Sequence, residues 1–246
     1  MRLPLLWVAC CCAVLTACSG STPTRPSKTP TLSRTRFLAF GDSMTSGEVS
    51  VPVGVVSANG ILNPSNTRMV IVTAASYPTQ LLAMAQSRYP PQAPLVTMAN
   101  AGKPGEYSFQ AGPRFADTIA EVKPEVVLLL HGVNDLPFLN SDLPASSLLD
   151  MTIQAKRAGA MVFLATLMPF KAGGRNSPNA ALVDELNGKI KAIAASQGVV
   201  LVNLFDALLP EANTVIGVDG LHPTEVGYKR MADVFFTSIQ VNLEVK

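Results

Sequence analysis

The sequence is poor in cysteine and histidine, and both shortages limit which residues can act as nucleophile, general base or metal ligand. Its 246 residues include only four cysteines, all within the first 18 positions. The rest of the chain can form no disulfide, so burial of apolar side chains has to stabilise it, and cysteine is excluded there as a nucleophile or metal ligand. Only two histidines, His131 and His222, are available as a general base.

Charge is also sparse and nearly balanced. Charged residues make up 15% of the sequence, with 19 Lys and Arg against 17 Asp and Glu, and they form no basic block. A nucleic-acid partner is therefore not expected. The segment 36–246 holds about 210 residues, enough for one domain with a full apolar core. None of these features determines the oligomeric state.

An apolar run, LPLLWVACCCAVL, follows Met1-Arg2 at the N-terminus. It is shorter than the ~20 residues that a helix needs to cross a bilayer, and it predicts a secretory signal peptide over residues 1–17. The end of this segment, Leu15-Thr16-Ala17-Cys18, resembles the bacterial lipobox, in which the cysteine is lipidated and becomes the first residue of the mature chain. An ordinary signal peptide cut near Ala17 is the alternative.

Residues 18–35 are rich in Ser, Thr and Pro, which predicts a flexible tether. A diacylated Cys18 would anchor the domain to a membrane, since stable anchoring takes more than one acyl chain. Ser19 follows the cysteine, in place of the aspartate associated with inner-membrane retention in enteric-type bacteria. We therefore expect an exported lipoprotein of the cell envelope, at the outer membrane or cell surface on the periplasmic or extracellular face, in a host that sorts lipoproteins in this way.

Short apolar runs alternate with segments of helical periodicity. The runs predict five strands, at 36–40, 94–100, 125–131, 161–167 and 199–204. The helical segments are 77–89, 111–122, 143–159, 179–198 and 224–243. The runs are apolar almost throughout, as is typical of strands covered on both faces. The alternation predicts an α/β fold, a single three-layer α/β/α domain over 36–246 with a five-stranded parallel sheet in flavodoxin-like order.

The segment 48–76 interrupts this alternation. A loop of about 30 residues without secondary structure would be unusual in a compact domain. Asn59-Gly60 is typical of a tight hairpin turn. We expect an inserted hairpin or loop here, forming a wall or lid beside the site.

Polar motifs follow the predicted strands at their carboxyl ends. Ser43 lies in FGDSMTSG after the first strand, Gly102 in NAGKPG after the second, and Asn134 in GVND after the third. Asp219 and His222 lie in DGLHPT, before the last helix. Ligands of open parallel sheets bind at this edge, so we expect the four motifs to line one crevice.

Ser43 needs a base within hydrogen-bond distance to act as a nucleophile. Asp219 precedes His222 by three residues, a spacing that lets the carboxylate accept from Nδ1–H while Nε2 faces the serine, as in a Ser-His-Asp triad. Taken alone, the motif fits equally well the start of a helix capped by aspartate. His131 is the less favoured base, because only Asp135 is spaced to orient it, and we expect it near the site in a supporting position.

Acyl transfer also needs hydrogen-bond donors aimed at the developing oxyanion. The backbone N–H groups of Ser43 and Gly102 and the side-chain amide of Asn134 form the natural set. Taken alone, NAGKPG and GVND are equally plausible as ordinary loops.

Together the motifs resemble the SGNH (GDSL-type) hydrolase family, whose four blocks are present in order over nearly the whole segment 36–246. The resemblance implies a nucleophilic Ser43, a triad completed by His222 and Asp219, and an oxyanion hole formed by Ser43, Gly102 and Asn134. It implies no metal and no other cofactor. The departures from the family pattern are the insertion after the first block and the segment 167–176.

The same resemblance implies a carboxylic ester hydrolase that acts through an acyl-enzyme on small-molecule, lipid or glycan esters. We expect short- to medium-chain acyl or aryl esters, with lysophospholipase or thioesterase activity as variants. A carbohydrate or cell-wall O-acetylesterase is the alternative. The apolar loops 136–139, 168–170 and 214–217 are candidates for an acyl pocket. A non-catalytic lipoprotein that binds glycan or lipid is the alternative of another class, and the complete set of triad residues disfavours it.

Overall fold

The structure of the protein is a computed structural model that describes residues 29–53, 67–137, 140–174 and 177–245. The expected signal peptide over 1–17 and the lipobox cysteine Cys18 lie outside the described residues, so both stay predictions. Loss of fatty-acid labelling in a Cys18→Ala variant is the measurement that checks them. Within the described ranges, no helix combines the length and apolar character needed to cross a bilayer.

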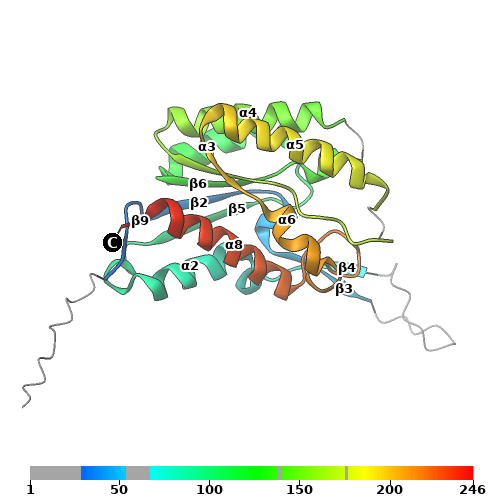
Figure 1. Cartoon of the computed structure of the whole chain (residues 1–246), viewed down its shortest axis with the longest axis horizontal. Coiled ribbons are helices and arrows are strands. Elements are labelled where there is room, and N and C mark those ends of the chain that lie inside the picture. Colours follow the sequence, from blue (N-terminus) through cyan, green and yellow to red (C-terminus); the bar gives the residue numbers. More distant parts are fainter. Residues whose placement is uncertain (1–28, 54–66, 138–139, 175–176, 246) are drawn as a thin grey trace, which may run out of the picture.

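A parallel sheet forms the middle layer of the domain (Figure 1). Its strands are β2 (Arg36–Gly41), β5 (Thr97–Gly102), β6 (Val126–Leu130), β7 (Met161–Ala165) and β8 (Val200–Val202). They lie in the order β5-β2-β6-β7-β8, with every neighbouring pair parallel. The second strand along the chain is therefore at one edge and the first lies beside it, which confirms the predicted flavodoxin-like order.

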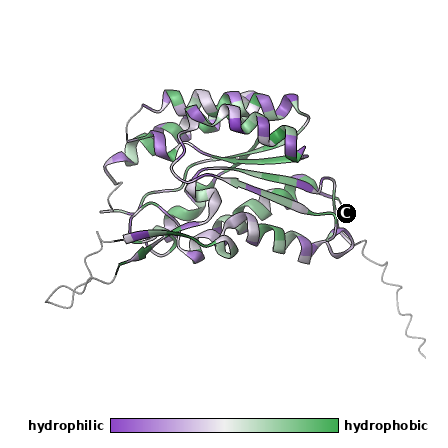
Figure 2. Cartoon of the chain, turned by 180° about the vertical axis from the view of Figure 1, so that it is seen from behind, coloured by the Kyte–Doolittle hydropathy of each residue, from purple (hydrophilic) through white to green (hydrophobic). Residues whose placement is uncertain are grey.

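The inner strands are buried on both faces, as their apolar sequences predict. All five residues of β6 are buried, and in β2 only the first residue is exposed. In Figure 2 the middle layer is correspondingly hydrophobic, whereas the outer helices alternate between hydrophilic and hydrophobic residues. Such a sheet is stable only between two covering layers.

Helices supply those layers. One face is covered by α3 (Gly112–Val122), α4 (Asp142–Arg157) and α5 (Ala180–Gln197), the other by α2 (Tyr77–Arg88) and α8 (Glu225–Leu243) (Figure 1). Shorter helical segments are α1 (Ser43–Ser46), α6 (Leu204–Leu208), α7 (Ala212–Val215), η1 (Thr73–Ala75), η2 (Pro90–Gln92), η3 (Ser108–Gln110), η4 (Val133–Asp135), η5 (Ser177–Asn179) and η6 (Leu209–Glu211). The rings of Tyr77 and Phe235 stack with centroids 4.8 Å apart, which joins α2 to α8.

The N-terminal boundary of the domain differs from the prediction. Residues 18–35 were expected to form a flexible tether, but β1 (Thr31–Leu32) pairs antiparallel with β9 (Glu244–Val245) at the C-terminus. Leu32 is buried, and the N–H of Ser33 donates to the carbonyl of Leu243 at 2.9 Å. The apolar side chain of Leu32 therefore brings the chain onto the domain at Thr31, before the predicted boundary at Arg36.

The inserted segment contains a two-stranded antiparallel ribbon, with β3 (Glu48–Pro52) paired to β4 (Thr67–Ile71). This pairing agrees with the expected hairpin. The turn predicted at Asn59-Gly60 lies outside the described residues. One residue, Gly47, separates the ribbon from the helix that carries Ser43, α1 (Ser43–Ser46). The ribbon lies at the carboxyl end of the sheet, remote from β1 and β9 (Figure 1).

Candidate active site

Strand β2 ends in a tight turn that presents Ser43. Asp42 caps α1, because its Oδ1 accepts a hydrogen bond from the N–H of Met44 at 3.0 Å. Gly47 ends the helix with φ +92°, a left-handed conformation that glycine adopts without strain. At Gly41 a Cβ atom would lie 2.0 Å from the carbonyl oxygen of Leu130, so only glycine lets β2 approach β6 here.

The structure brings Ser43, His222 and Asp219 together as the sequence predicts. Ser43 Oγ lies 2.9 Å from His222 Nε2, and His222 Nδ1 lies 2.6 Å from Asp219 Oδ2. Asp219 Oδ1 also accepts from the backbone N–H groups of Leu221 and His222. The loop is closed at its base, where the N–H of Gly217 donates to the carbonyl of His222 at 2.8 Å. These bonds fix the imidazole with Nδ1 toward the carboxylate and Nε2 toward the serine.

Asp219 is held in its ionised form. Burial by itself raises the pKa of Asp219, but the hydrogen bond and charge of His222 outweigh that effect, together with bonds from the Leu221 N–H and the Ser50 hydroxyl. The pKa therefore lies below its ordinary value. An ionised carboxylate at this position accepts a hydrogen bond from Nδ1–H and stabilises positive charge that develops on the ring.

The ribbon supplies two polar residues that the sequence analysis did not assign to the site. Ser50 Oγ donates to Asp219 Oδ1 at 3.0 Å. Glu48 Oε2 lies 3.6 Å from His222 Nε2. Side chains two apart on a strand share one face, so the alternation Glu48-Val49-Ser50 directly after the serine motif is the signal that indicates both residues.

The role of Gly102 in the structure differs from the oxyanion-binding role expected for its N–H. Its N–H donates to Asn100 Oδ1 at 3.0 Å and is thus already bonded within its own loop. A Cβ atom at Gly102 would lie 2.1 Å from the backbone nitrogen of Ser46. Glycine is therefore required here so that β5 can pack against α1, and an oxyanion-binding role for this N–H is not supported.

Gly105, three residues further on, is better placed to donate. It lies in the turn Lys103–Glu106 with φ +72°, after Pro104, the arrangement that a type II turn requires. Its N–H has no acceptor among the described residues. The N–H of Lys103 donates to the carbonyl of Gly41 at 3.0 Å, which holds the turn beside the serine. The Pro-Gly pair in NAGKPG was the available signal, since it predicts a turn with an outward N–H.

Asn134 lies beside the same turn. It belongs to η4 (Val133–Asp135), and one N–H of its side-chain amide donates to the carbonyl of Glu106 at 3.0 Å. The amide has a second N–H, because a primary amide carries two donors. The carbonyl of Glu106 therefore sets the orientation of the Asn134 amide.

His131 lies in a separate buried cluster behind this turn. Its Nε2 is 3.2 Å from Glu106 Oε2, and its Nδ1 accepts from the N–H of Gly132 at 2.9 Å. Arg114 contacts the same Glu106 carboxylate through Nε at 2.9 Å and through its Nη2. Burial by itself raises the pKa of Glu106. The hydrogen bonds from His131 and Arg114 and the charge of Arg114 outweigh that effect, so the pKa is lowered to about 2. Both ring nitrogens of His131 are thus occupied by protein groups, and it lies near the site in a supporting position.

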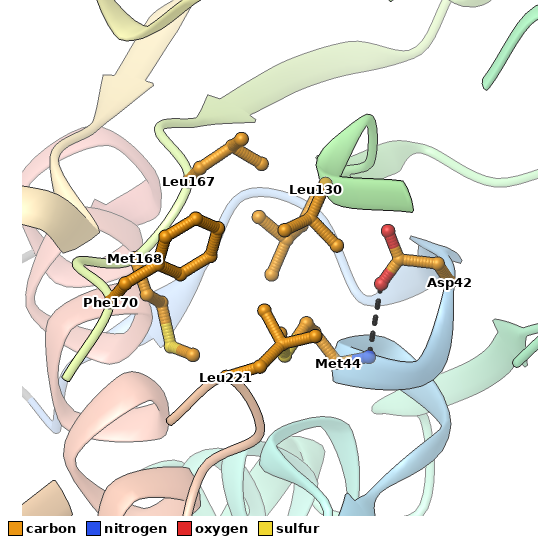
Figure 3. Close-up of a pocket in the computed structure, with 8 residues that line it drawn as sticks. Asp42, Met44, Leu130, Leu167, Met168, Phe170 and Leu221 are labelled. Atoms are coloured by element: carbon orange, nitrogen blue, oxygen red, sulfur yellow. Dashed lines mark hydrogen bonds between the residues drawn. The ribbon is translucent and has the colours of Figure 1, made fainter. Parts of the chain in front are cut away.

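An apolar pocket is lined in part by Asp42 and Met44, the residues on either side of Ser43 (Figure 3). It is lined by Asp42, Met44, Leu130, Val133, Leu167, Met168, Phe170 and Leu221. Met44 directly follows Ser43 and Leu221 directly precedes His222, so the pocket is lined by a sequence neighbour of each residue. Of the three predicted pocket loops, 168–170 contributes lining residues. The cavity volume of about 10 Å³ is that of a single water-sized sphere.

Comparison with known protein families gives one match over most of the chain. The model of the GDSL-like lipase/acylhydrolase family matches residues 39–230. This span includes all the residues of the Ser43–His222–Asp219 cluster and both strands of the ribbon. No curated protein matches the sequence.

Solved structures resemble the chain in fold. The acetylxylan esterase Axe2 from Geobacillus stearothermophilus matches with a TM-score of 0.64 and 20% identity, over 85% of this chain and 94% of that one. LAE5, an alpha/beta hydrolase enzyme from the metagenome of Lake Arreo, Spain, matches with 0.65 and 18%, over 83% and 94%. A putative lipolytic protein of the G-D-S-L family from Desulfitobacterium hafniense DCB-2 matches with 0.58 and 17%, over 83% and 99%. At these identities the likeness shows a shared fold.

Proposed function

The chain belongs to the GDSL-like lipase/acylhydrolase family, and we propose that it cleaves short-chain carboxylic esters through an acyl-enzyme on Ser43. Family membership makes it a carboxylic ester hydrolase. The observation that carries the proposed mechanism is the hydrogen-bonded series from Ser43 Oγ through His222 to Asp219, with distances of 2.9 and 2.6 Å.

In the first half-reaction Ser43 Oγ attacks the ester carbonyl carbon while His222 Nε2 takes the hydroxyl proton. The tetrahedral intermediate collapses when His222 returns that proton to the alkoxy oxygen, which leaves as the alcohol. In the second half-reaction water, deprotonated by His222, attacks the acyl carbon and releases the carboxylic acid from Ser43. Asp219 stabilises the imidazolium in both halves, as its orientation toward Nδ1 requires.

We assign the oxyanion donors to three groups at the edge of the sheet. The N–H of Ser43, as the first residue of α1, has no partner within the helix. The outward N–H of Gly105 and the second N–H of the Asn134 amide complete the set. Lys103 and Glu106 fix the turn and the amide through backbone bonds, so these donors are in place before substrate arrives.

The size of the apolar pocket favours a short acyl group. A cavity of about 10 Å³ offers space for about one water-sized sphere, which favours the smallest acyl group, acetyl. A long fatty-acyl chain would have to lie outside it. Lysophospholipase activity on long acyl chains is therefore the less favoured reading, and an O-acetylesterase is favoured.

Hydrolysis of p-nitrophenyl esters from acetyl to palmitoyl tests both parts of the proposal. We expect Ser43→Ala to lower kcat/KM by about 10⁴-fold or more, since it removes the nucleophile, and we expect the wild type to prefer acetate. Ser87→Ala, an exposed serine on α2, is the matched control and should retain full activity. Retained turnover in Ser43→Ala refutes the mechanism, whereas a palmitate optimum refutes the assignment of a short acyl group alone.

A further inference from the structure

The ribbon places a carboxylate beside the ring nitrogen that handles the proton. Glu48 Oε2 lies 3.6 Å from His222 Nε2, and the Glu48 side chain is 16% exposed. Its backbone is fixed, because the carbonyl of Glu48 accepts from the Tyr228 hydroxyl at 2.6 Å and β3 is paired with β4. Glu48 therefore holds a defined position next to the site while its carboxylate still reaches water.

The Glu48 carboxylate lacks a donor of its own. Among the described residues, no N–H or O–H group donates a hydrogen bond to it, and Nε2 of the His222 ring lies 3.6 Å from its Oε2. Asp219 differs, because it accepts from two backbone N–H groups, from Ser50 and from His222. The acceptor capacity of Glu48 is thus available to a ligand.

The position of Glu48 relative to the reacting atoms determines which part of a substrate it contacts. His222 Nε2 returns the proton to the alkoxy oxygen, so that oxygen must come within about 3 Å of Nε2. A carboxylate next to the same nitrogen flanks the leaving alcohol. The acyl half is assigned, under the proposed function, to the separate apolar pocket that Met44 and Leu221 help to line.

We propose that Glu48 selects the alcohol half of the ester, favouring a polyol or sugar whose hydroxyl lies next to the ester oxygen and excluding anionic alcohols such as a glycerol phosphate. A vicinal hydroxyl donates to the Glu48 carboxylate and supplies the hydrogen bond that the protein does not. A phosphate or carboxylate at the same place is repelled by Glu48 and by the nearby Asp219. The inference rests on the proposed function and deepens it, naming O-acylated polyols and sugars as the substrate class.

Three acetate esters with the same three-carbon skeleton separate these effects. n-Propyl acetate offers no hydroxyl, glycerol 1-acetate offers a vicinal hydroxyl, and 1-acetylglycerol 3-phosphate adds an anion. For the wild type, we expect kcat/KM for glycerol acetate to exceed that for propyl acetate by about tenfold, the size of one charge-assisted hydrogen bond. We expect it to exceed that for the phosphate by about tenfold or more, because the Glu48 carboxylate repels the anion. Equal rates on glycerol acetate and the phosphate ester would overturn the exclusion of anions.

The isosteric variant Glu48→Gln then tests the residue itself. We expect the ratio of kcat/KM for glycerol acetate over propyl acetate to fall about tenfold, and the phosphate ester to gain relative to glycerol acetate. Glu121→Gln, an exposed glutamate on α3, makes the same charge change away from the site and should leave both ratios unchanged. If Glu48→Gln scales all three esters by one factor, Glu48 acts on His222 or on folding, and the proposal is wrong.

The wild-type comparison needs no variant, so it remains decisive if Glu48→Gln does not fold. Ser43→Ala on the same esters keeps the two proposals apart. Turnover that survives in Ser43→Ala refutes the proposed function, whereas an inert Ser43→Ala with unchanged ester ratios in Glu48→Gln refutes only the inference about Glu48.

Discussion

His131 and His222 each lie near two carboxylates, yet they differ in what their second ring nitrogen meets. His131 has Glu106 at 3.2 Å from Nε2 and Asp42 at 3.6 Å from Nδ1, and its side chain is fully buried. His222 has Asp219 at 2.6 Å from Nδ1 and Glu48 at 3.6 Å from Nε2, and its side chain is 10% exposed. The groups around the two rings are nearly the same.

The difference is that Nε2 of His222 faces the Ser43 hydroxyl, whereas both nitrogens of His131 are bonded to fixed protein groups. A histidine with two carboxylates is therefore not by itself a catalytic base. It needs one nitrogen directed at the reacting atom and open to substrate. The buried cluster instead stabilises the turn that carries Gly105 and, through the Glu106 carbonyl, the Asn134 amide.

Replacing each histidine by asparagine is the most direct test of this difference between His131 and His222. We expect His222→Asn to lower kcat/KM by about 10⁴-fold with little change in stability, because it removes the proton carrier. His131→Asn should lower activity by less than about tenfold but cost about 1–3 kcal/mol of unfolding free energy, because it removes one of the buried partners of the Glu106 carboxylate. Parallel ester assays and urea unfolding measure both effects, and the reverse order of activities would make His131 the base.

Substitution of Asn134 tests whether the buried cluster affects catalysis through the side-chain amide that it orients. Asn134→Ala should lower kcat by about 10²-fold and leave KM within a few-fold, as expected for loss of one oxyanion donor. Asn100→Ala is the matched control, since Asn100 only accepts from the Gly102 N–H. We expect it to lose less than tenfold. A loss in kcat for Asn100→Ala as large as that for Asn134→Ala would contradict the assignment, because removal of an acceptor that takes no part in oxyanion binding would then have the same effect.

The smallest expected effect concerns acid stability. The pKa of Glu106 is about 2 in the folded chain, against about 4.3 in an unfolded one. Because the folded value is the lower one, its stabilisation is complete above about pH 4.3 and is lost as pH falls toward 2, a change of about 3 kcal/mol. Glu106→Gln should be less stable near pH 6, and the difference from wild type should shrink on acidification. A difference that stays constant between pH 6 and 2.5 in urea titrations would contradict this.

Much of the fold was predictable because its signals are local. Uniformly apolar runs separated by helical periodicity gave five strands and five long helices close to where they lie. The tether boundary was misplaced because one apolar residue, Leu32, in a polar stretch gives no periodic signal. Its burial depends on the C-terminal strand β9, over 200 residues away along the chain.

The site was predictable to the extent that its groups are close in sequence or fall at strand ends. Asp219 and His222 are three residues apart, so their contact is set by one turn of loop. The donor Gly105 was missed in favour of Gly102, because both glycines follow the same strand. Only the packing of Gly102 against Ser46 and the left-handed φ of Gly105 distinguish them.

By itself, the sequence determined the layered α/β architecture, the turn that presents Ser43, our proposed nucleophile, and the pairing of Asp219 with His222, since periodicity, turn residues and short spacings act locally. Tertiary structure alone decided that Glu48 of the ribbon lies beside Nε2 of His222. The physical reason is that the group next to a histidine ring nitrogen comes from a segment far away in the sequence. Its position depends on how the two segments pack, and no local sequence pattern indicates that packing.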